Sequence, residues 1–223
     1  MEFRAYPDRE MMFMELADEL ASELGNCLRT HEHASFCVPG GRTPGPIFDV
    51  LSDVALDWSR VHVFLNDERW VPESSDRSNT RLLRERLLIG RAAKAKLIPM
   101  VADVPEPEDA LDHLSAGFAD ELPISVLLLG MGTDMHTASL FPGADRLDDA
   151  LAPGAPTLMA MRAPGAPEPR VTLTAHVLEG AMSKHVVVTG SEKREAIERA
   201  RSLSRRDAPI TAVWNGAVVH WAE

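Results

Sequence analysis

Hydrophobic positions along the chain follow two patterns, short continuous apolar runs and longer segments with helical spacing. The continuous runs are ASFCV (34–38), VHVFLND (61–67), ISVLLLG (124–130) and HVVVTG (185–190). Such runs are typical of strands that are covered on both faces of a parallel sheet. ISVLLLG is the most apolar of them, so we expect it to occupy a central position in that sheet.

Segments with helical spacing separate these runs. The first follows Asp8, which is placed to cap a helix, and we expect this helix to end at Gly25. Pro44 and Pro46 are placed to open a second helix, because proline is tolerated in a first turn. The remaining helices are expected at residues 78–88, 106–122 and 191–201.

Strands that alternate with helices of about ten or more residues predict an α/β protein. We therefore expect a Rossmann-like parallel sheet with helices on both faces, in one domain over residues 1–223, since no repeat or long linker interrupts the pattern. A stretch rich in Pro, Gly and Ala leaves room for a small antiparallel excursion around residues 150–175. Further short strands are expected at residues 158–161, 170–174, 210–214 and 217–221.

Composition and charge restrict the function. A net charge of −11 argues against nucleic-acid binding, which depends on clustered Lys and Arg, and the one Arg-rich patch (199–207) is typical of a solvated helix end. No apolar stretch is long enough to cross a membrane. Acidic residues throughout the first twenty positions do not fit a signal peptide. We expect a cytoplasmic protein in which Cys27 and Cys37 are small hydrophobes and not a disulfide.

Unusual residues follow the first two expected strands, at the edge of a parallel sheet where ligands bind. In PGGRTPG (39–45), Gly40 and Gly41 let the backbone approach a ligand, and the following helix N-terminus offers N–H groups to an anion. The alternative is a tight strand-to-helix turn. NDERW (66–70) places three ionisable residues after its strand, and the alternative there is a solvated loop with a surface ion pair.

The strand at 185–190 is followed by TGSEKREA (189–196), in which Ser191 is placed to cap a helix. Lys193 then lies in the first turn, where a cation opposes the helix dipole. This position is favourable if an anion binds at the helix end. The alternative is an exposed lysine that is tolerated at a small cost.

A single histidine, His136, follows the expected central strand in GMGTDMHTASLFPG (130–143). The sixth position of its G-x-G-x-x-M pattern does not match the dinucleotide fingerprint. The chain has no H-E-x-x-H spacing, no Cys/His cluster and no G-x-S-x-G elbow, so neither a metal site nor a serine hydrolase is predicted. His136 is therefore the candidate catalytic group, and the alternative is an incidental ring in a turn.

Five motifs in this order resemble those of the 6-phosphogluconolactonases, which belong to the larger group of sugar-phosphate isomerases and glucosamine-6-phosphate deaminases. They are GGRTP, NDERWVPESSDRSNT, LLLGMGTDMHTASLFPG, RVTLT and TGSEKREAI, and the resemblance extends over about residues 38 to 214. DERWVP and HTASLFPG favour the lactonases over the deaminases.

Two positions depart from the pattern: Pro39 stands where the lactonases usually have a serine, and Met135 where they usually have glycine. Met135 must then avoid a positive φ or be strained.

The resemblance implies hydrolysis of 6-phospho-D-glucono-1,5-lactone in the oxidative pentose phosphate pathway, without metal or cofactor. A δ-lactone is a reactive ester, and one neutral imidazole, with an ordinary pKa of about 6.5, can take a proton from water and return it to the ring oxygen. We hypothesise that His136 is this base and acid, and that Asp67 orients it or the water. The phosphate and sugar would be held by Gly40, Gly41, Arg42, Thr43, Arg69, Arg170 and Lys193.

Two other functions stay open at this point. An aldose–ketose isomerase or a deaminase would use Asp67 as the base on a carbon-bound proton, with His136 as a ring-opening helper. A sugar-phosphate-sensing module would bind the same ligand without catalysis. In every case the expected partner is a small phosphorylated sugar, and the protein is expected to be a monomer or a homodimer.

Overall fold

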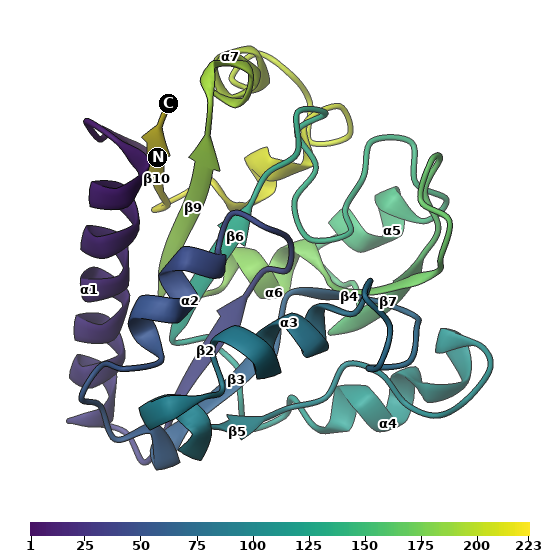
Figure 1. Ribbon diagram of the computed structural model, residues 1–223. Coiled ribbons are helices and arrows are strands. Elements are labelled where there is room, and N and C mark those ends of the chain that lie inside the picture. The colour runs from purple at the N-terminus through teal and green to yellow at the C-terminus, as the bar shows by residue number, and fades with distance from the viewer.

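Seven parallel strands form the main sheet of the computed structural model, which describes residues 1–223 (Figure 1). All six strand pairings in this sheet are parallel. β6, the most apolar run of the sequence, is the fourth of the seven strands, which confirms its expected central position. The strand order is β1 (Glu2–Ala5), β10 (Val218–Ala222), β9 (Ser183–Thr189), β6 (Val126–Gly130), β2 (Ala34–Val38), β3 (Val61–Leu65) and β5 (Lys96–Leu97).

A second, three-stranded sheet is antiparallel and has the order β4 (Asp67–Arg69), β8 (Arg170–Leu173) and β7 (Leu158–Met161). It confirms the antiparallel excursion expected around residues 150–175. The register pairs Arg69 with Arg170 and Asp67 with Thr172. This pairing brings together two segments that lie about a hundred residues apart in the sequence.

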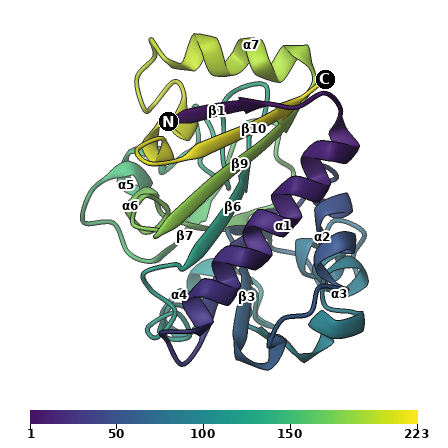
Figure 2. The same ribbon diagram turned by 90° about the vertical axis from the view of Figure 1, so that its left-hand side faces the viewer.

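Helices cover both faces of the main sheet, as the sequence predicts. α1 and α2 lie on one face, with α3 beside α2, and α4, α5, α6 and the small sheet lie on the other (Figures 1 and 2). α7 packs against β9. Every helix is too short or too polar to cross a bilayer. The helices are α1 (Arg9–Leu28), α2 (Gly45–Leu51), α3 (Asn79–Arg86), α4 (Leu111–Ala116), α5 (Leu147–Leu151), α6 (Ala175–Glu179) and α7 (Ser191–Ala200), with 3₁₀ helices η1 (Trp58–Arg60), η2 (Gly90–Lys94), η3 (Pro107–Ala110) and η4 (Pro209–Val213).

The first helix begins as expected but ends later. The Asp8 carboxylate accepts a hydrogen bond from the Met11 N–H, which caps α1. The helix does not end at Gly25 but continues to Leu28. Leu28 is buried in the same row as Leu24, so its packing offsets the cost of about 0.5–1 kcal/mol for a glycine inside a helix.

Two other expected elements are wrong in type or length. Residues 210–214 form no strand, because Pro209 opens the 3₁₀ helix η4 there. A short apolar run alone does not distinguish a strand from a buried helical turn. The helix expected at 106–122 is reduced to η3 and α4, since the chain leaves the helix at Gly117 although Phe118 beyond it is buried.

The order of the strands defines where a ligand site is expected. From β2 the chain proceeds through β3 to β5 in one direction, then returns to β6 on the other side of β2 and continues through β9 to β10. The sheet therefore has its topological switch point between β2 and β6. In open α/β sheets, ligands bind in the crevice outside the carboxyl ends of the strands at such a point.

Candidate active site

A pocket of about 240 Å³ opens at this switch point. All nine residues singled out from the sequence line it: Gly40, Gly41, Arg42, Thr43, Asp67, Arg69, His136, Arg170 and Lys193. No ligand-binding or catalytic role was predicted for the other nine lining residues, which are Pro39, Pro44, Asn66, Asn79, Gly130, Met131, Gly132, Ala138 and Val187. The fold brings the predicted residues together, and their individual roles stay predictions.

The loop after β2 depends on two glycines. A Cβ on Gly40 would lie 2.0 Å from Oδ1 of Asn79, and Gly41 has a φ of +86°, which favours glycine. Asn79 also donates from Nδ2 to the carbonyl of Asp67 at 3.1 Å. Gly40 therefore allows the loops after β2 and β3 to meet at the pocket.

The same loop offers backbone donors, but not in the way the sequence predicts. The N–H groups of residues 40–43 bond to no other protein group, so all four are free for an anion. The N-terminus of α2 contributes less than expected. Pro44 and Pro46 have no N–H, and the N–H of Gly45 donates to the carbonyl of Arg42 at 3.3 Å. The loop therefore offers more free donors than the helix end does.

His136 has a carboxylate partner in its own loop. Its Nδ1 lies 2.6 Å from Oδ1 of Asp134, and its backbone N–H donates to the same oxygen at 3.2 Å. Gly132 makes room for this pair, because a Cβ there would lie 2.3 Å from Nδ1 of His136. Burial acts to raise the pKa of Asp134, but the hydrogen bond and charge of His136 outweigh it and leave that pKa below its usual value. With Nδ1–H donated to an ionised carboxylate, Nε2 is the free base of the neutral ring.

Asp67 makes its side-chain contacts with residues other than His136, and its expected role of orienting the imidazole or the water stays a prediction. The buried Asp67 accepts a hydrogen bond on Oδ2 from the Ser139 hydroxyl at 2.5 Å. The same oxygen lies 3.5 Å from a guanidinium nitrogen of Arg170. The pairing of β4 with β8 fixes this contact, which depends on tertiary structure and is not readable from the motif.

The backbone around His136 is strained at two non-glycine residues. Met135 has a φ of 67° and Ala138 a φ of 49°. Such conformations cost about 1–3 kcal/mol each and cluster at functional sites. Met135 is held there by hydrogen bonds from its N–H to the Gly132 carbonyl (3.0 Å) and to its carbonyl from Ile210 (3.1 Å). The replacement of the usual glycine by Met135 therefore does introduce strain.

Phe141 connects the histidine to one of the cations. The His136 ring stacks on Phe141 with the ring centroids 4.1 Å apart, and the guanidinium of Arg170 lies over the Phe141 ring at 5.2 Å. Phe141 thereby limits the orientations open to both side chains. Phe141 lies within the HTASLFPG motif, but stacking is not visible from spacing, so no role was predicted for it.

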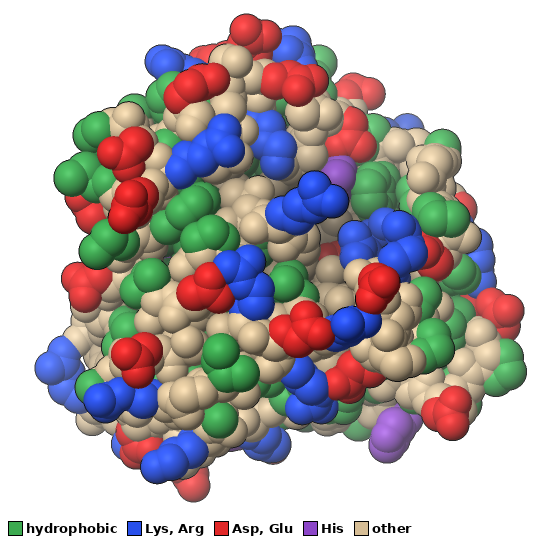
Figure 3. Space-filling view, in the orientation of Figure 1, with side chains coloured by type: hydrophobic (Ala, Val, Ile, Leu, Met, Phe, Trp, Pro, Cys, Tyr) green, Lys and Arg blue, Asp and Glu red, His purple; other side chains and the backbone are tan.

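Four cationic side chains line the pocket although the chain is acidic overall. Lys and Arg side chains gather around the hollowed centre of one face of the molecule in Figure 3, with a histidine among them. The Nε atoms of Arg69 and Arg170 are buried without a hydrogen-bond partner. Burial lowers the pKa of the Arg170 guanidinium, and the charge of Asp67 opposes this shift. Buried donors without acceptors are costly, so these two groups are candidates for contact with an anion.

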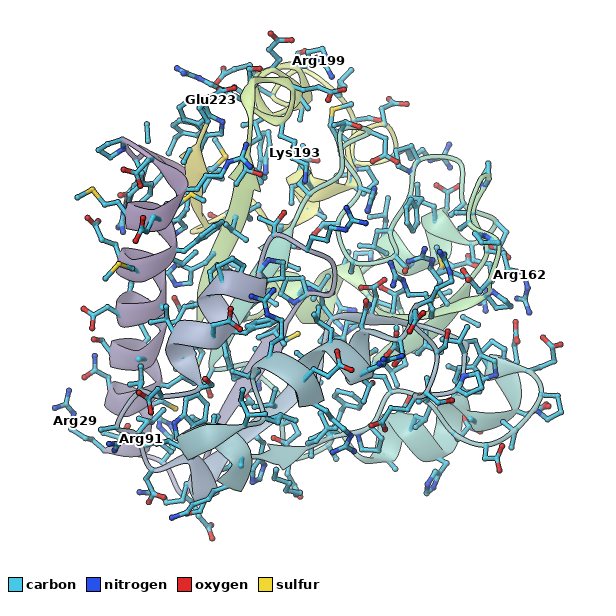
Figure 4. All side chains as sticks on the ribbon, in the orientation of Figure 1. Arg29, Arg91, Arg162, Lys193, Arg199 and Glu223 are labelled. Carbon is cyan, nitrogen blue, oxygen red and sulfur yellow. The ribbon has the colours of Figure 1, made fainter.

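Lys193 extends from the first turn of α7 toward the pocket (Figure 4). Burial lowers the pKa of its ammonium group, against an opposing effect of Asp134. Ser191 does not cap α7, contrary to expectation. The capping position is Gly190, which has a φ of 87° and turns the chain sharply at the end of β9.

A buried carboxylate that the sequence analysis left without a role holds the loop after β3 in place. Glu68 is fully buried and accepts hydrogen bonds from the backbone N–H groups of Arg69 and Asn79, both at 2.8 Å, and of Thr80 at 2.6 Å. Burial raises the pKa of Glu68, and the hydrogen bonds partly offset that effect. Glu68 thus ties β4 to the N-terminus of α3, which positions Arg69 and Asn79 at the pocket.

Comparisons with known proteins identify one family. The family model described as glucosamine-6-phosphate isomerases/6-phosphogluconolactonase matches residues 7–221. Proteins named 6-phosphogluconolactonase from Rhizobium meliloti and Pseudomonas aeruginosa are each 40% identical to the chain, covering 93% and 92% of it and 92% and 88% of their own lengths. A 6-phosphogluconolactonase structure from Shewanella baltica has a TM-score of 0.96 and 32% identity over 100% of this chain and 98% of its own. The corresponding structure from Thermotoga maritima has a TM-score of 0.83 and 25% identity, covering 100% and 99%.

Proposed function

The chain belongs to the glucosamine-6-phosphate isomerase/6-phosphogluconolactonase family, and we propose that it hydrolyses 6-phospho-D-glucono-1,5-lactone to 6-phospho-D-gluconate in the oxidative pentose phosphate pathway. The observation that carries the proposal is the Asp134–His136 pair at the edge of a pocket with four cations. A base next to an anion-binding pocket suits a phosphorylated ester. The relatives named above are lactonases, which supports the same choice within the family.

In the proposed reaction, His136 Nε2 takes a proton from a water molecule as the water oxygen attacks the lactone carbonyl carbon. A tetrahedral intermediate forms with negative charge on the former carbonyl oxygen. The bond between this carbon and the ring oxygen then breaks, and His136 returns its proton to the ring oxygen. Asp134 stays ionised throughout and stabilises the imidazolium that exists between the two proton transfers.

The cations divide between two anionic groups of the substrate. We assign the phosphate to Lys193, Arg42 and the free N–H groups of residues 40–43, because the two side chains carry no ion pair of their own. Arg170 is assigned to the charge that develops on the carbonyl oxygen, since it stacks on the same Phe141 ring as His136. Asp67 then acts through Arg170 and the attacking water.

Deaminase or isomerase chemistry would require Asp67 to abstract a proton from carbon. One of its carboxylate oxygens is already occupied by Ser139 and Arg170, which favours a positioning role.

The decisive experiment follows lactone opening and ammonia release in parallel, with the phosphorylated lactone and glucosamine 6-phosphate as substrates. We expect lactone opening above the spontaneous rate and no ammonia. Ammonia release alone would assign the chain to the deaminase branch, and binding without either product would indicate a sensing module.

The cytoplasmic location, the absence of nucleic-acid partners and the monomeric or homodimeric state stay predictions from the sequence. Cys37 is buried and Cys27 is half-buried, and the two are not bonded to each other.

A further inference from the structure

Three residues with metal-binding side chains meet at the edge of the sheet opposite the pocket. His33 directly precedes β2, His62 is the second residue of β3, and Glu121 lies shortly before β6. These are the N-terminal ends of three neighbouring parallel strands. The sequence separates the three residues by up to 88 positions, so no ligand spacing was recognisable in it.

The ligand atoms of this cluster lie close enough together for a shared ion. Nδ1 of His62 lies 2.8 and 3.0 Å from the two Glu121 carboxylate oxygens, and Nε2 of His33 lies 3.5 Å from one of them. The three ligand atoms all lie within 4.8 Å of one another. Two ligand atoms on one tetrahedral Zn²⁺ are about 3.3 Å apart, given Zn–N and Zn–O bonds of about 2.0–2.1 Å.

Glu121 has no other charged partner. Its side chain is 2% exposed, and its polar contacts are with the two imidazoles, which stack on each other with centroids 4.2 Å apart. A buried carboxylate is stable when it is paired with a cation or bound to a metal. The two imidazoles make metal binding possible, because two histidines and a glutamate are an established ligand set for zinc.

An ion can reach the cluster. The side chains of His62 and His33 are 17% and 29% exposed. A hollow of about 270 Å³ borders His33 and Glu121 and is also lined by Cys27 and Ser125. Three protein ligands on one side and an open hollow on the other leave a fourth coordination position for water.

A second trio of potential ligands, Glu19, His185 and His220, fails the same test. His220 already bonds Tyr6 through Nδ1 (2.8 Å) and His185 through Nε2 (3.0 Å). Both of these histidines are almost completely buried. Burial closes both rings off from an entering ion, so this trio is a hydrogen-bond network.

We propose that His33, His62 and Glu121 bind one zinc-like divalent cation, with water as the fourth ligand. On binding, His62 Nδ1 exchanges its hydrogen bond to Glu121 for the metal. The more exposed His33 ring leaves its stack on His62, because two nearly parallel rings cannot both direct an in-plane lone pair at one ion, and its Nε2 exchanges the contact with the Asp120 carbonyl at 3.0 Å for the metal. Any proton on these two nitrogens is released to solvent. The ion links the starts of β2, β3 and β6 and stabilises the sheet at the edge away from the pocket. The proposal is independent of the proposed lactonase reaction.

The test uses the full chain, stripped with a chelator and dialysed against Zn²⁺ alone, with bound metal measured per chain. His33→Gln and His62→Gln remove one ligand each, and His113→Gln replaces an exposed histidine of α4 as the matched control. We expect one zinc per chain in the parent and in His113→Gln, and at least tenfold weaker binding in the two ligand variants. Co²⁺ should give the parent, but not His62→Gln, the visible absorption of a tetrahedral site. Circular dichroism checks the fold of each variant.

Three outcomes would overturn the proposal. The stripped parent takes up no zinc, or zinc uptake is unchanged in both ligand variants, or it is lost only when His136 is replaced by asparagine. The first result would leave a structural contact between histidines and a carboxylate. The last would place the ion at the pocket. Lactone opening is measured on the same samples, so that a loss of zinc uptake and a loss of lactonase activity are recorded separately.

Discussion

Nδ1 of His136 lies 2.6 Å from Oδ1 of Asp134, two positions earlier in the same loop. The contact needs Gly132 beneath it and a left-handed Met135 between its members. It fixes which ring nitrogen carries the proton and leaves the other to accept one. The orientation of the proposed base is thus built into a single turn after the central strand.

Asp134→Asn removes the charge of this partner and keeps its size. We expect kcat to fall about ten- to a hundredfold with little change in KM, because the imidazolium loses its stabilising carboxylate. Steady-state kinetics with the phosphorylated lactone separate the two constants, and equal changes in KM and kcat would speak against a positioning role.

Lys193→Ala should weaken the binding of 6-phosphogluconate. The variant loses a charge-assisted contact of about 1.5–3 kcal/mol, which corresponds to roughly ten- to a hundredfold in Kd. Lys94→Ala, an exposed lysine of η2, is the control and should bind like the parent. Calorimetry gives the two constants, and equal affinities would remove Lys193 from the anion site.

The pH dependence of 6-phosphogluconate binding should show whether Lys193 supplies a charge that holds the ligand. Because burial lowers the pKa of this ammonium group from its usual 10.5, the free protein loses the charge at a lower pH than an ordinary lysine would. The contribution of Lys193 to ligand affinity is therefore fully present below the lowered pKa and is lost as the pH rises through it. Lys193→Arg should keep its affinity to higher pH, and an identical decline in parent and variant would disprove the assignment.

His220 should make the fold sensitive to acid. Burial lowers its pKa to about 3, with His185 and Arg4 adding to the shift, whereas an unfolded histidine titrates near 6.5. The unfolded state thus binds the extra proton first, so stability is fully present above pH 6.5 and is lost as the pH falls toward 3. The loss is on the order of a few kcal/mol.

Urea unfolding of the parent and His220→Gln at pH 7, 6, 5 and 4 tests this sensitivity. The variant should be less stable at pH 7, because it loses part of the network with Tyr6 and His185, but its stability should fall less steeply with acid. His113→Gln is the exposed control. Parallel curves for the parent and His220→Gln would show that other groups cause the acid sensitivity.

Met135 offers a test of the backbone strain. Met135→Val should destabilise the protein by roughly 1–2 kcal/mol or more, since a β-branched side chain is poorly tolerated at positive φ. Met135→Gly relieves the strain but loses packing and adds unfolded-state entropy, so its stability should stay near that of the parent. Thermal unfolding of the three proteins measures the difference, and a Val variant as stable as the Gly variant would contradict the strained conformation.

The fold was largely predictable from sequence because the pattern is local. Continuous apolar runs separated by helical segments led to a parallel sheet, and the most apolar run was correctly expected in a central position, where β6 lies. Residues that follow strand ends were then expected at one edge, and all nine candidates line one pocket. The strand expected at 210–214 was wrong for a local reason as well, because this short apolar run fits a buried 3₁₀ turn as well as a strand.

The site's internal contacts were less predictable because they depend on tertiary pairing. The β4–β8 register brings Arg170 to Asp67, and Glu68 reaches the first turn of a helix that begins eleven residues later. Asp134 was close in sequence to His136, but only the backbone conformation at Met135 shows that the two side chains meet. Spacing in the sequence did not carry these relationships.

The central claim is that His136 transfers the proton during lactone opening. The most direct test is the turnover of 6-phospho-D-glucono-1,5-lactone by His136→Asn, with spontaneous hydrolysis subtracted at each pH, the fold checked by circular dichroism and 6-phosphogluconate binding measured on the same sample. We expect an intact fold, near-parental binding and a loss of about 10²- to 10⁴-fold in kcat. Near-parental turnover by the folded variant would contradict the claim and make Asp67 the candidate base.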